Sequence, residues 1–242
     1  MFEEYVAQIV SEAVSEYPKE AVWLITPGEC RLVDNCHEDP QNFFSVSKRD
    51  IGVAMSKGLL AIVHSHPNGV SAPSEADMES QISTNVPWGV LSTDGVTAGD
   101  LAWWGAPDQA PPLIGRPFRH GITDCYALIK DFYHIELGIT LPEFPRSWEW
   151  WNEGGAGFTS GFPAAGFTVI DESEALPGDV WLAQIRSEVP NHGGVLLEGE
   201  LILHQGGSTH QVDQSKRSAR EPLYRYRPLI THWLRHKDLH KK

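Results

Sequence analysis

The segment GAPDQAPPLIGRP, residues 105–117, interrupts the chain and divides it into two parts. Gly, Pro and Ala dominate this segment, and it has little hydrophobic periodicity, as is typical of a linker. Each flanking part is long enough to fold around a core of its own. The sequence therefore predicts two domains. We expect them over residues 1–104 and 117–228, with the linker at 105–116 and a basic C-terminal segment at 229–242.

The first part alternates between amphipathic and apolar segments. The periodicity predicts helices over about residues 3–17, over 48–56 and from Ser74 onward. Strands are expected at AVWLIT, around residues 30–34, and at LLAIVHS, WGVLST and DLAWW. This order of elements is that of an α/β domain with a mixed sheet and covering helices.

The second part begins with a helix, expected from Asp124 to about Leu137. Short strands are expected after it at FTVI, DVWLAQI, GGVLL and LILHQ. A helix followed by a mostly antiparallel sheet is an α+β arrangement. Between helix and strands lies an aromatic cluster, which either lines a substrate groove or belongs to the core: Trp148, Trp150 and Trp151.

The balance of charge excludes one class of partner. The chain has 32 acidic and 19 basic residues, a net charge of −13, and such a surface repels phosphate backbones, so nucleic acid is not expected to bind. No apolar run reaches about 18 residues, so we expect a soluble chain with no membrane-inserted segment. The acidic start lacks the pattern of a secretory signal. Three cysteines at no familiar disulfide spacing indicate reduced thiols and folding in a cytoplasm.

Basic residues outnumber acidic ones from Lys216 onward. Such a stretch is either a solvated tail or a docking segment for an acidic partner surface. On the second interpretation, deletion of residues 229–242 should abolish binding to that partner.

The stretch HSHPNGVSAPSEAD carries the strongest chemical signal. His64 and His66 alternate at the end of a predicted strand, so both side chains project from one face, as two ligands of a single ion must. Ser74 can cap the following helix, which places Asp77 in its first turn. Two imidazoles and one carboxylate leave a fourth position open, as in catalytic zinc sites. An isolated pair of this kind would more often be two ordinary strand-end histidines.

The full spacing H-x-H-x₇-S-x₂-D resembles that of the JAMM (MPN-domain) metallopeptidases, over about residues 1–104. The resemblance implies the cytidine-deaminase-like mixed sheet of that family, Zn²⁺ on the two histidines and the aspartate, and hydrolysis of a peptide or isopeptide bond. It also implies that Glu20 is the general acid/base and that Ser74 stabilises the tetrahedral oxyanion. No residue pattern indicates the substrate of this site.

A second candidate site lies in the second part of the chain. In HGITDCYALIKDFY, Cys125 follows a residue that can cap a helix, and the helix N-terminus lowers the pKa of a thiol. A hairpin with a three-residue loop at 197–199 would place His204 opposite His192. His192 is then the predicted base, and His204 the residue that orients it. The alternative is an inert buried cysteine and two ordinary histidines.

The pieces DC, GITLPEFPR, LPGDVWL and the two histidines, in this order, resemble the NlpC-type cysteine peptidases, a papain-like family. The resemblance covers about residues 116–228. Members of that family typically cut the D-γ-glutamyl to diamino-acid bond of peptidoglycan, so the resemblance implies that Cys125 cuts a bond in the stem peptides. The sequence Asn191-His192-Gly193-Gly194 departs from the family, which more usually has an apolar residue after His-x.

A JAMM domain joined to an NlpC-type domain resembles the tail-tip proteins of lambda-like phages. The resemblance implies other tail-tip proteins as partners, peptidoglycan as a substrate, assembly in the host cytoplasm, and action from the virion tail tip at the host periplasm and cell wall. The sequence leaves two other interpretations open. One is a structural assembly or plug component with reduced catalytic activity, and the other is a cellular wall-remodelling peptidase.

Overall fold

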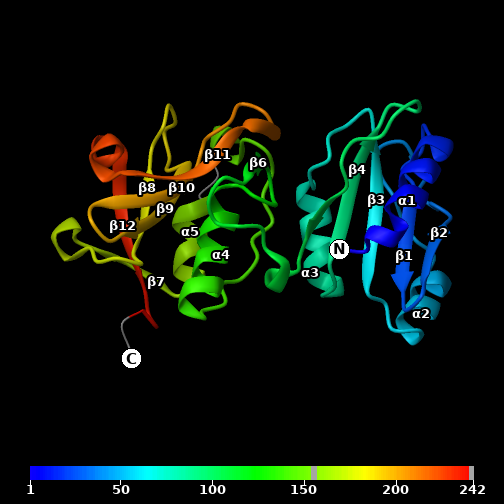
Figure 1. Ribbon diagram of the computed structural model, residues 1–242, viewed down its shortest axis with the longest axis horizontal. Helices are drawn as coiled ribbons and strands as arrows, with labels where there is room; N and C mark the ends of the chain where they lie inside the picture. Colours follow the sequence, from blue (N-terminus) through cyan, green and yellow to red (C-terminus); the bar gives the residue numbers. More distant parts are fainter. Residues whose placement is uncertain (154–156, 240–242) are drawn as a thin grey trace. The chain divides into compact units, whose positions relative to one another are not determined.

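The computed structural model describes residues 1–153 and 157–239. It divides the chain into two compact units, Met1–Ala106 and Pro107–Lys242 (Figure 1). Each unit has its own sheet and its own hydrophobic core. The predicted fold class, α/β followed by α+β, is confirmed. Among the described residues, no helix is both long and apolar enough to cross a membrane.

The N-terminal unit is a five-stranded sheet with three helices. The strands follow the order β2-β1-β3-β4-β5, and β3 and β4 are the parallel pair. The helices are α1 (Glu3–Glu16), α2 (Lys48–Ser56) and α3 (Glu75–Thr84). The strands are β1 (Val22–Thr26), β2 (Glu29–Val33), β3 (Ala61–Pro67), β4 (Trp88–Thr93) and β5 (Ala102–Trp104).

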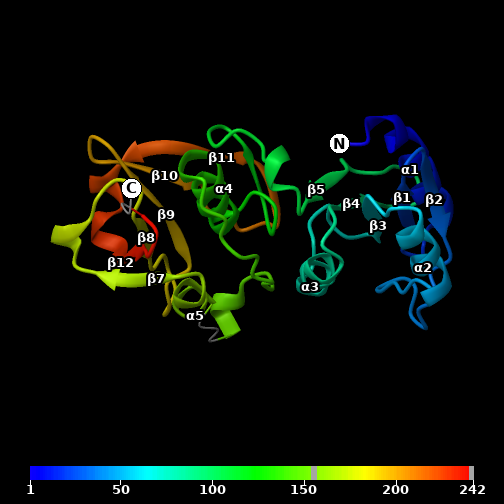
Figure 2. The same cartoon turned by 90° about the horizontal axis from the view of Figure 1, so that it is seen from below.

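The two faces of this sheet have different roles. Figure 2 shows α1 on one side of the sheet and α2 and α3 on the other. Trp23 of β1 and Val63 of β3 pack with Ile9 and Ala13 of α1 in one buried cluster. Because side chains alternate along a strand, His64 points to the opposite face. That face is the one on which α3 lies.

The C-terminal unit is a seven-stranded sheet packed against α4. The strand order is β6-β11-β10-β9-β8-β12-β7, and all pairs are antiparallel. The helices are α4 (Cys125–Leu137) and α5 (Gly157–Ala164), with short 3₁₀ turns at Pro107–Gln109, Trp150–Glu153, Glu172–Glu174, Leu223–Arg225 and Arg227–Leu229. The strands are β6 (Pro117–Arg119), β7 (Phe167–Ile170), β8 (Val180–Ala183), β9 (His192–Leu197), β10 (Leu201–Gln205), β11 (Val212–Pro222) and β12 (Ile230–His236).

The apolar side of α4 is what holds this helix on the sheet. Leu128 and Ile129 are fully buried and pack with Val195 of β9 and Leu203 of β10. This close packing fixes the position of α4 and therefore of its first residue, Cys125.

Strand β12 corrects one prediction. The sequence favours a separate basic segment at residues 229–242, but Ile230–His236 lie within the sheet, hydrogen-bonded to β8 on one side and to β7 on the other. Trp233 and Leu234 are buried there. The interpretation of these residues as a free tail is therefore wrong. Trp233 and Leu234 are consecutive and pack into different core clusters, so this strand lacks the alternation that would have marked it, and the basic residues around it suggested a tail.

Candidate active sites

The metal-ligand candidates converge beside the end of β3. Nε2 of His64 lies 3.0 Å from Nε2 of His66 and 3.3 Å from Oδ1 of Asp77. Nε2 of His66 lies 3.5 Å from Oδ2 of Asp77. The ligand atoms of all three residues fall within 4.8 Å of one another. Two imidazole nitrogens and one carboxylate so placed can hold a metal ion.

The loop that follows β3 fixes two of these ligands. Nδ1 of His66 lies 3.0 Å from the carbonyl oxygen of Val70. Because a carbonyl only accepts, Nδ1 carries the proton and Nε2 keeps its lone pair for an ion. Ser74 caps α3 as predicted: its hydroxyl donates to Oδ2 of Asp77 at 2.7 Å and accepts from the Asp77 N–H at 3.2 Å. Ser74 is thus joined to the ligands through Asp77.

Glu20 lies at the entry to β1 and is 7% exposed. The pKa of Glu20 is raised from 4.5 to about 7, chiefly by burial; His66 opposes this rise, and the Asp77 and Asp39 carboxylates add to it. Val22 of β1 pairs with His64 of β3, so Glu20, two residues before Val22, lies beside the end of β3 that carries the ligands. A carboxyl group with a pKa near 7 can both take and give a proton at neutral pH.

Sequence reasoning missed the loop between β2 and α2, which also borders this site. Asn35 organises the loop: its Nδ2 donates to the carbonyl oxygens of Glu20 at 3.1 Å and of Phe43 at 3.0 Å. The ring of Phe44 lies 4.9 Å from that of His64, centroid to centroid. Asn and Pro in this stretch indicate a turn, but no sequence signal shows what the turn contacts.

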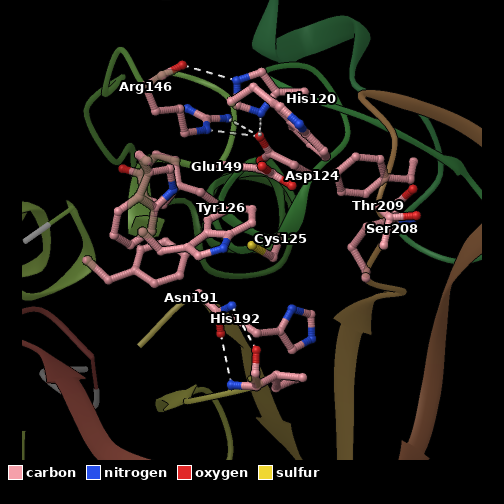
Figure 3. Close-up of a pocket in the computed structure, with 18 of the residues that line it drawn as sticks. His120, Asp124, Cys125, Tyr126, Arg146, Glu149, Asn191, His192, Ser208 and Thr209 are labelled. Atoms are coloured by element: carbon pink, nitrogen blue, oxygen red, sulfur yellow. Dashed lines mark hydrogen bonds and ion pairs between the residues drawn. The ribbon is translucent and has the colours of Figure 1, made fainter. Parts of the chain in front are cut away.

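Cys125 is the first residue of α4 and lines a cavity of about 600 Å³. Asp124 is the helix cap, and its Oδ1 accepts a hydrogen bond from the Ala127 N–H at 3.0 Å. Figure 3 shows the Cys125 sulfur between Asp124 and His192. The sequence left open whether the aromatic cluster lines a groove or belongs to the core; in the structure it lines this cavity. We call it the tryptophan wall: Trp148, Trp150 and Trp151.

His192 and His204 lie side by side, although the predicted strand register is wrong. Nε2 of His192 lies 3.2 Å from Nδ1 of His204, and both residues are buried. Leu197 pairs with Leu201, so the residue opposite His204 is Gly194. The register differs from the predicted one by two residues. Because side chains alternate with a period of two, both histidines remain on one face and the contact persists.

The thiol and the imidazole of this site are both neutral at pH 7. The pKa of Cys125 is raised to about 12, chiefly by burial and also by the Asp124 carboxylate. The pKa of His192 is lowered to about 3, chiefly by burial and also by His204. The expectation of a lowered thiol pKa is therefore wrong, because burial outweighs the helix N-terminus. A neutral His192 is nevertheless in the form that accepts a proton.

Sequence reasoning also missed Arg146, which lines the same cavity. Its Nε and Nη2 donate to Oδ2 of Asp124 at 2.9 and 2.7 Å. No spacing rule links residues 124 and 146, since the segment between α4 and the tryptophan wall is irregular. The isolated arginine in GITLPEFPR was the available signal.

Comparison with known proteins agrees with this arrangement. The model for prokaryotic homologs of the JAB domain matches residues 2–105, and the model for the NlpC/P60 family matches residues 115–229. Tail tip assembly protein K of Escherichia phage N15 is 31% identical over 206 residues, which cover 81% of this chain and 82% of that protein. The chain belongs to the tail tip assembly protein K family.

A second member of the K family shows the same relation. Tail tip assembly protein K of Escherichia phage lambda is 38% identical over 151 residues, which cover 62% of this chain and 71% of that protein. A solution structure of a protein from Salinibacter ruber is 20% identical, with a TM-score of 0.32, over 44% of this chain and 81% of that one. A similarity that low carries no weight for the K-family chain.

Proposed function

We propose that the C-terminal unit is a cysteine peptidase that cuts the stem peptides of peptidoglycan. The observation that carries this proposal is that Cys125 and His192 line one cavity and that His192 in turn contacts His204. Since Nε2 of His192 faces His204, Nδ1 of His192 is the nitrogen that accepts the proton from the Cys125 thiol. His192 takes the proton as sulfur attacks the amide carbon, and then gives it to the leaving amine. Water hydrolyses the resulting thioester.

We further propose that the N-terminal unit is a zinc peptidase acting on a peptide or isopeptide bond. Two imidazoles and a carboxylate, one imidazole already oriented by a backbone carbonyl, fit Zn²⁺. Bound zinc would supply Lewis-acid activation of a water molecule. Glu20 would take and return the proton. The single hydroxyl proton of Ser74, which is donated to Asp77 in the free site, would be donated to the oxyanion when substrate is bound.

The names of the two relatives support a role at the tail tip. We propose that the chain binds other tail-tip proteins, is assembled in the host cytoplasm and acts at the cell wall when the particle reaches it. The relatives' names also favour a second candidate, an assembly component whose peptidase sites have reduced activity.

The test uses purified peptidoglycan, turbidity clearing and muropeptide analysis. Wild type should release cleaved stem peptides, and Cys125→Ala should abolish release. Cys36→Ala is the matched control, because it removes an exposed thiol from the other unit. His66→Ala should leave stem-peptide cleavage intact but lower the zinc content measured by plasma mass spectrometry. No cleavage by wild type, free or in tails, would reject the peptidase and favour the assembly role.

A further inference from the structure

Arg146 lies at the junction between the start of α4 and the cavity wall. Besides its two hydrogen bonds to Asp124, it donates from Nη1 to the carbonyl oxygen of Phe144 at 2.7 Å. Its guanidinium carbon lies 5.4 Å from the ring centroid of Tyr126, and its carbonyl oxygen lies 3.0 Å from Nε2 of His120. One residue thus joins the segment that carries the tryptophan wall to the residues on either side of the nucleophile.

The charge of Arg146 offsets an unfavourable effect of the Asp124 carboxylate on the thiol at the start of α4. The helix needs a cap, and Asp124 supplies one. A buried carboxylate beside the thiol, however, disfavours the thiolate, and Asp124 does raise the pKa of Cys125. Arg146 lowers the same pKa. Its side chain is 12% exposed, so solvent screens the ion pair only weakly.

We propose that Arg146 is a positioning residue for Cys125: its ion pair with Asp124 holds the start of α4 against the tryptophan wall and offsets the carboxylate charge beside the thiol. The inference rests on the proposed role of Cys125 as the nucleophile, but it concerns the thiol itself and not the peptide that is cut. The other titratable or charged side chains that line the cavity around Cys125 are His120, Asp124, Tyr126, Arg146, Glu149, Arg186, His192 and Lys216.

The experiment measures the rate at which iodoacetamide alkylates Cys125 in the full-length protein between pH 6 and 10, by mass spectrometry of the peptide that contains it. This readout needs no substrate. Arg146→Gln leaves Asp124 uncompensated, so alkylation at pH 8 should be about three- to tenfold slower than in wild type. Adding Asp124→Asn removes the opposing charge and keeps the cap, because Asn caps as well as Asp. The double variant should regain the wild-type rate within about twofold.

The controls separate charge from structure. Arg235→Gln breaks a similar pair, since Arg235 donates to Asp179 at 2.9 and 2.6 Å in the same unit, and neither residue lines the cavity. It should leave the alkylation of Cys125 unchanged. The exposed thiol of Cys36 is an internal standard in every sample.

Two results would overturn the proposal: an unchanged rate in folded Arg146→Gln, or a double variant as slow as the single one. Arg146→Lys keeps the charge but loses the pair of hydrogen bonds to Asp124, so Cys125 should be alkylated faster in this variant than in Arg146→Gln. It serves as the test if Arg146→Gln does not fold. Failure of wild type to cut peptidoglycan, with these alkylation differences intact, would reject the peptidase proposal and leave the role of Arg146 standing.

Discussion

At the scale of single residues, Gly194 is the point where β9 passes closest to its neighbours. A Cβ atom there would lie 2.3 Å from the carbonyl oxygen of Leu203 and 2.8 Å from Cζ2 of Trp181. Only glycine fits. This explains why the chain departs from the apolar residue that the resemblance implies after His-x: the indole of Trp181 occupies the space that such a side chain would need.

Gly194→Ala should therefore destabilise the C-terminal unit by about 2 kcal/mol, because the strand pair must separate to admit a methyl group. Urea unfolding followed by tryptophan fluorescence measures the change. Gly207→Ala is the control, since a Cβ there has no heavy atom within 4 Å. Equal stability of the two variants would contradict the close contact at Gly194.

Asp124 gives a prediction for pH. Although burial opposes it, the charges of Arg146 and His120 and the helix cap lower the pKa of Asp124 from 3.8 to about 2. A carboxyl group with a lowered folded-state pKa stabilises the fold above its unfolded pKa, and this stabilisation is lost as the pH falls toward 2. Wild type should lose about 2 kcal/mol between pH 4 and pH 2 through this group.

The measurement is the free energy of unfolding of wild type and Asp124→Asn at pH 5, 4, 3 and 2. The gap between the two proteins should shrink as the pH falls, since both then carry an uncharged cap. Asp108→Asn, which changes a largely exposed carboxylate, should retain the acid loss of wild type. A gap that stays constant down to pH 2 would refute the assignment.

At the scale of elements, the strands with apolar runs could be predicted and the polar ones could not. The run VWLIT of β1 is buried at every position, and its hydrophobicity alone indicates a strand. β11 has eleven residues, of which Ser218 is the one that is buried. Its sequence is therefore mostly polar and resembles that of a loop. One of its partners, β10, is the preceding strand, but the other, β6, is distant in the sequence, and such distant pairing has no local signal.

The residues of the candidate sites likewise fall into those that the sequence predicts and those that it does not. His64 and His66 lie on one strand and Asp77 lies in the capped helix that follows, all within 14 residues, so local rules suffice to bring them together. The contact between His192 and His204 survives a register error, because an even shift preserves the face. Asn35 and Arg146 act through irregular loops, where only the tertiary structure decides which groups meet.

Strand β12 gives a prediction at this scale. Deleting residues 230–242 removes the strand that lies between β8 and β7, together with buried Trp233 and Leu234. The C-terminal unit should then fail to unfold cooperatively in urea, with loss of protected amides in β8. Lys237→Gln removes a charge from the same segment and should leave both properties unchanged. A cooperative transition in the deletion variant would restore the interpretation of this segment as a separate tail.

At the scale of the whole molecule, each unit contains the complete ligand or nucleophile set of one site. His64, His66 and Asp77 all lie in Met1–Ala106, and Cys125, His192 and His204 all lie in Pro107–Lys242. Each unit also has a core of its own. A ligand that binds only the folded state stabilises the body that holds it. The two sites should therefore respond separately to their own ligands.

Zinc should protect the N-terminal unit alone. At a free concentration of about 100 times the dissociation constant, a single site adds about 2.7 kcal/mol to the stability of the folded state. Hydrogen exchange with and without zinc should show slower exchange in β3 and α3 and no change in β9 and β10. His66→Ala should abolish the protection, whereas His37→Ala, which removes a histidine outside the ligand cluster, should retain it. Protection that spreads equally to β9 and β10 would show that the units do not behave as separate bodies, and protection that survives His66→Ala would place the ion elsewhere.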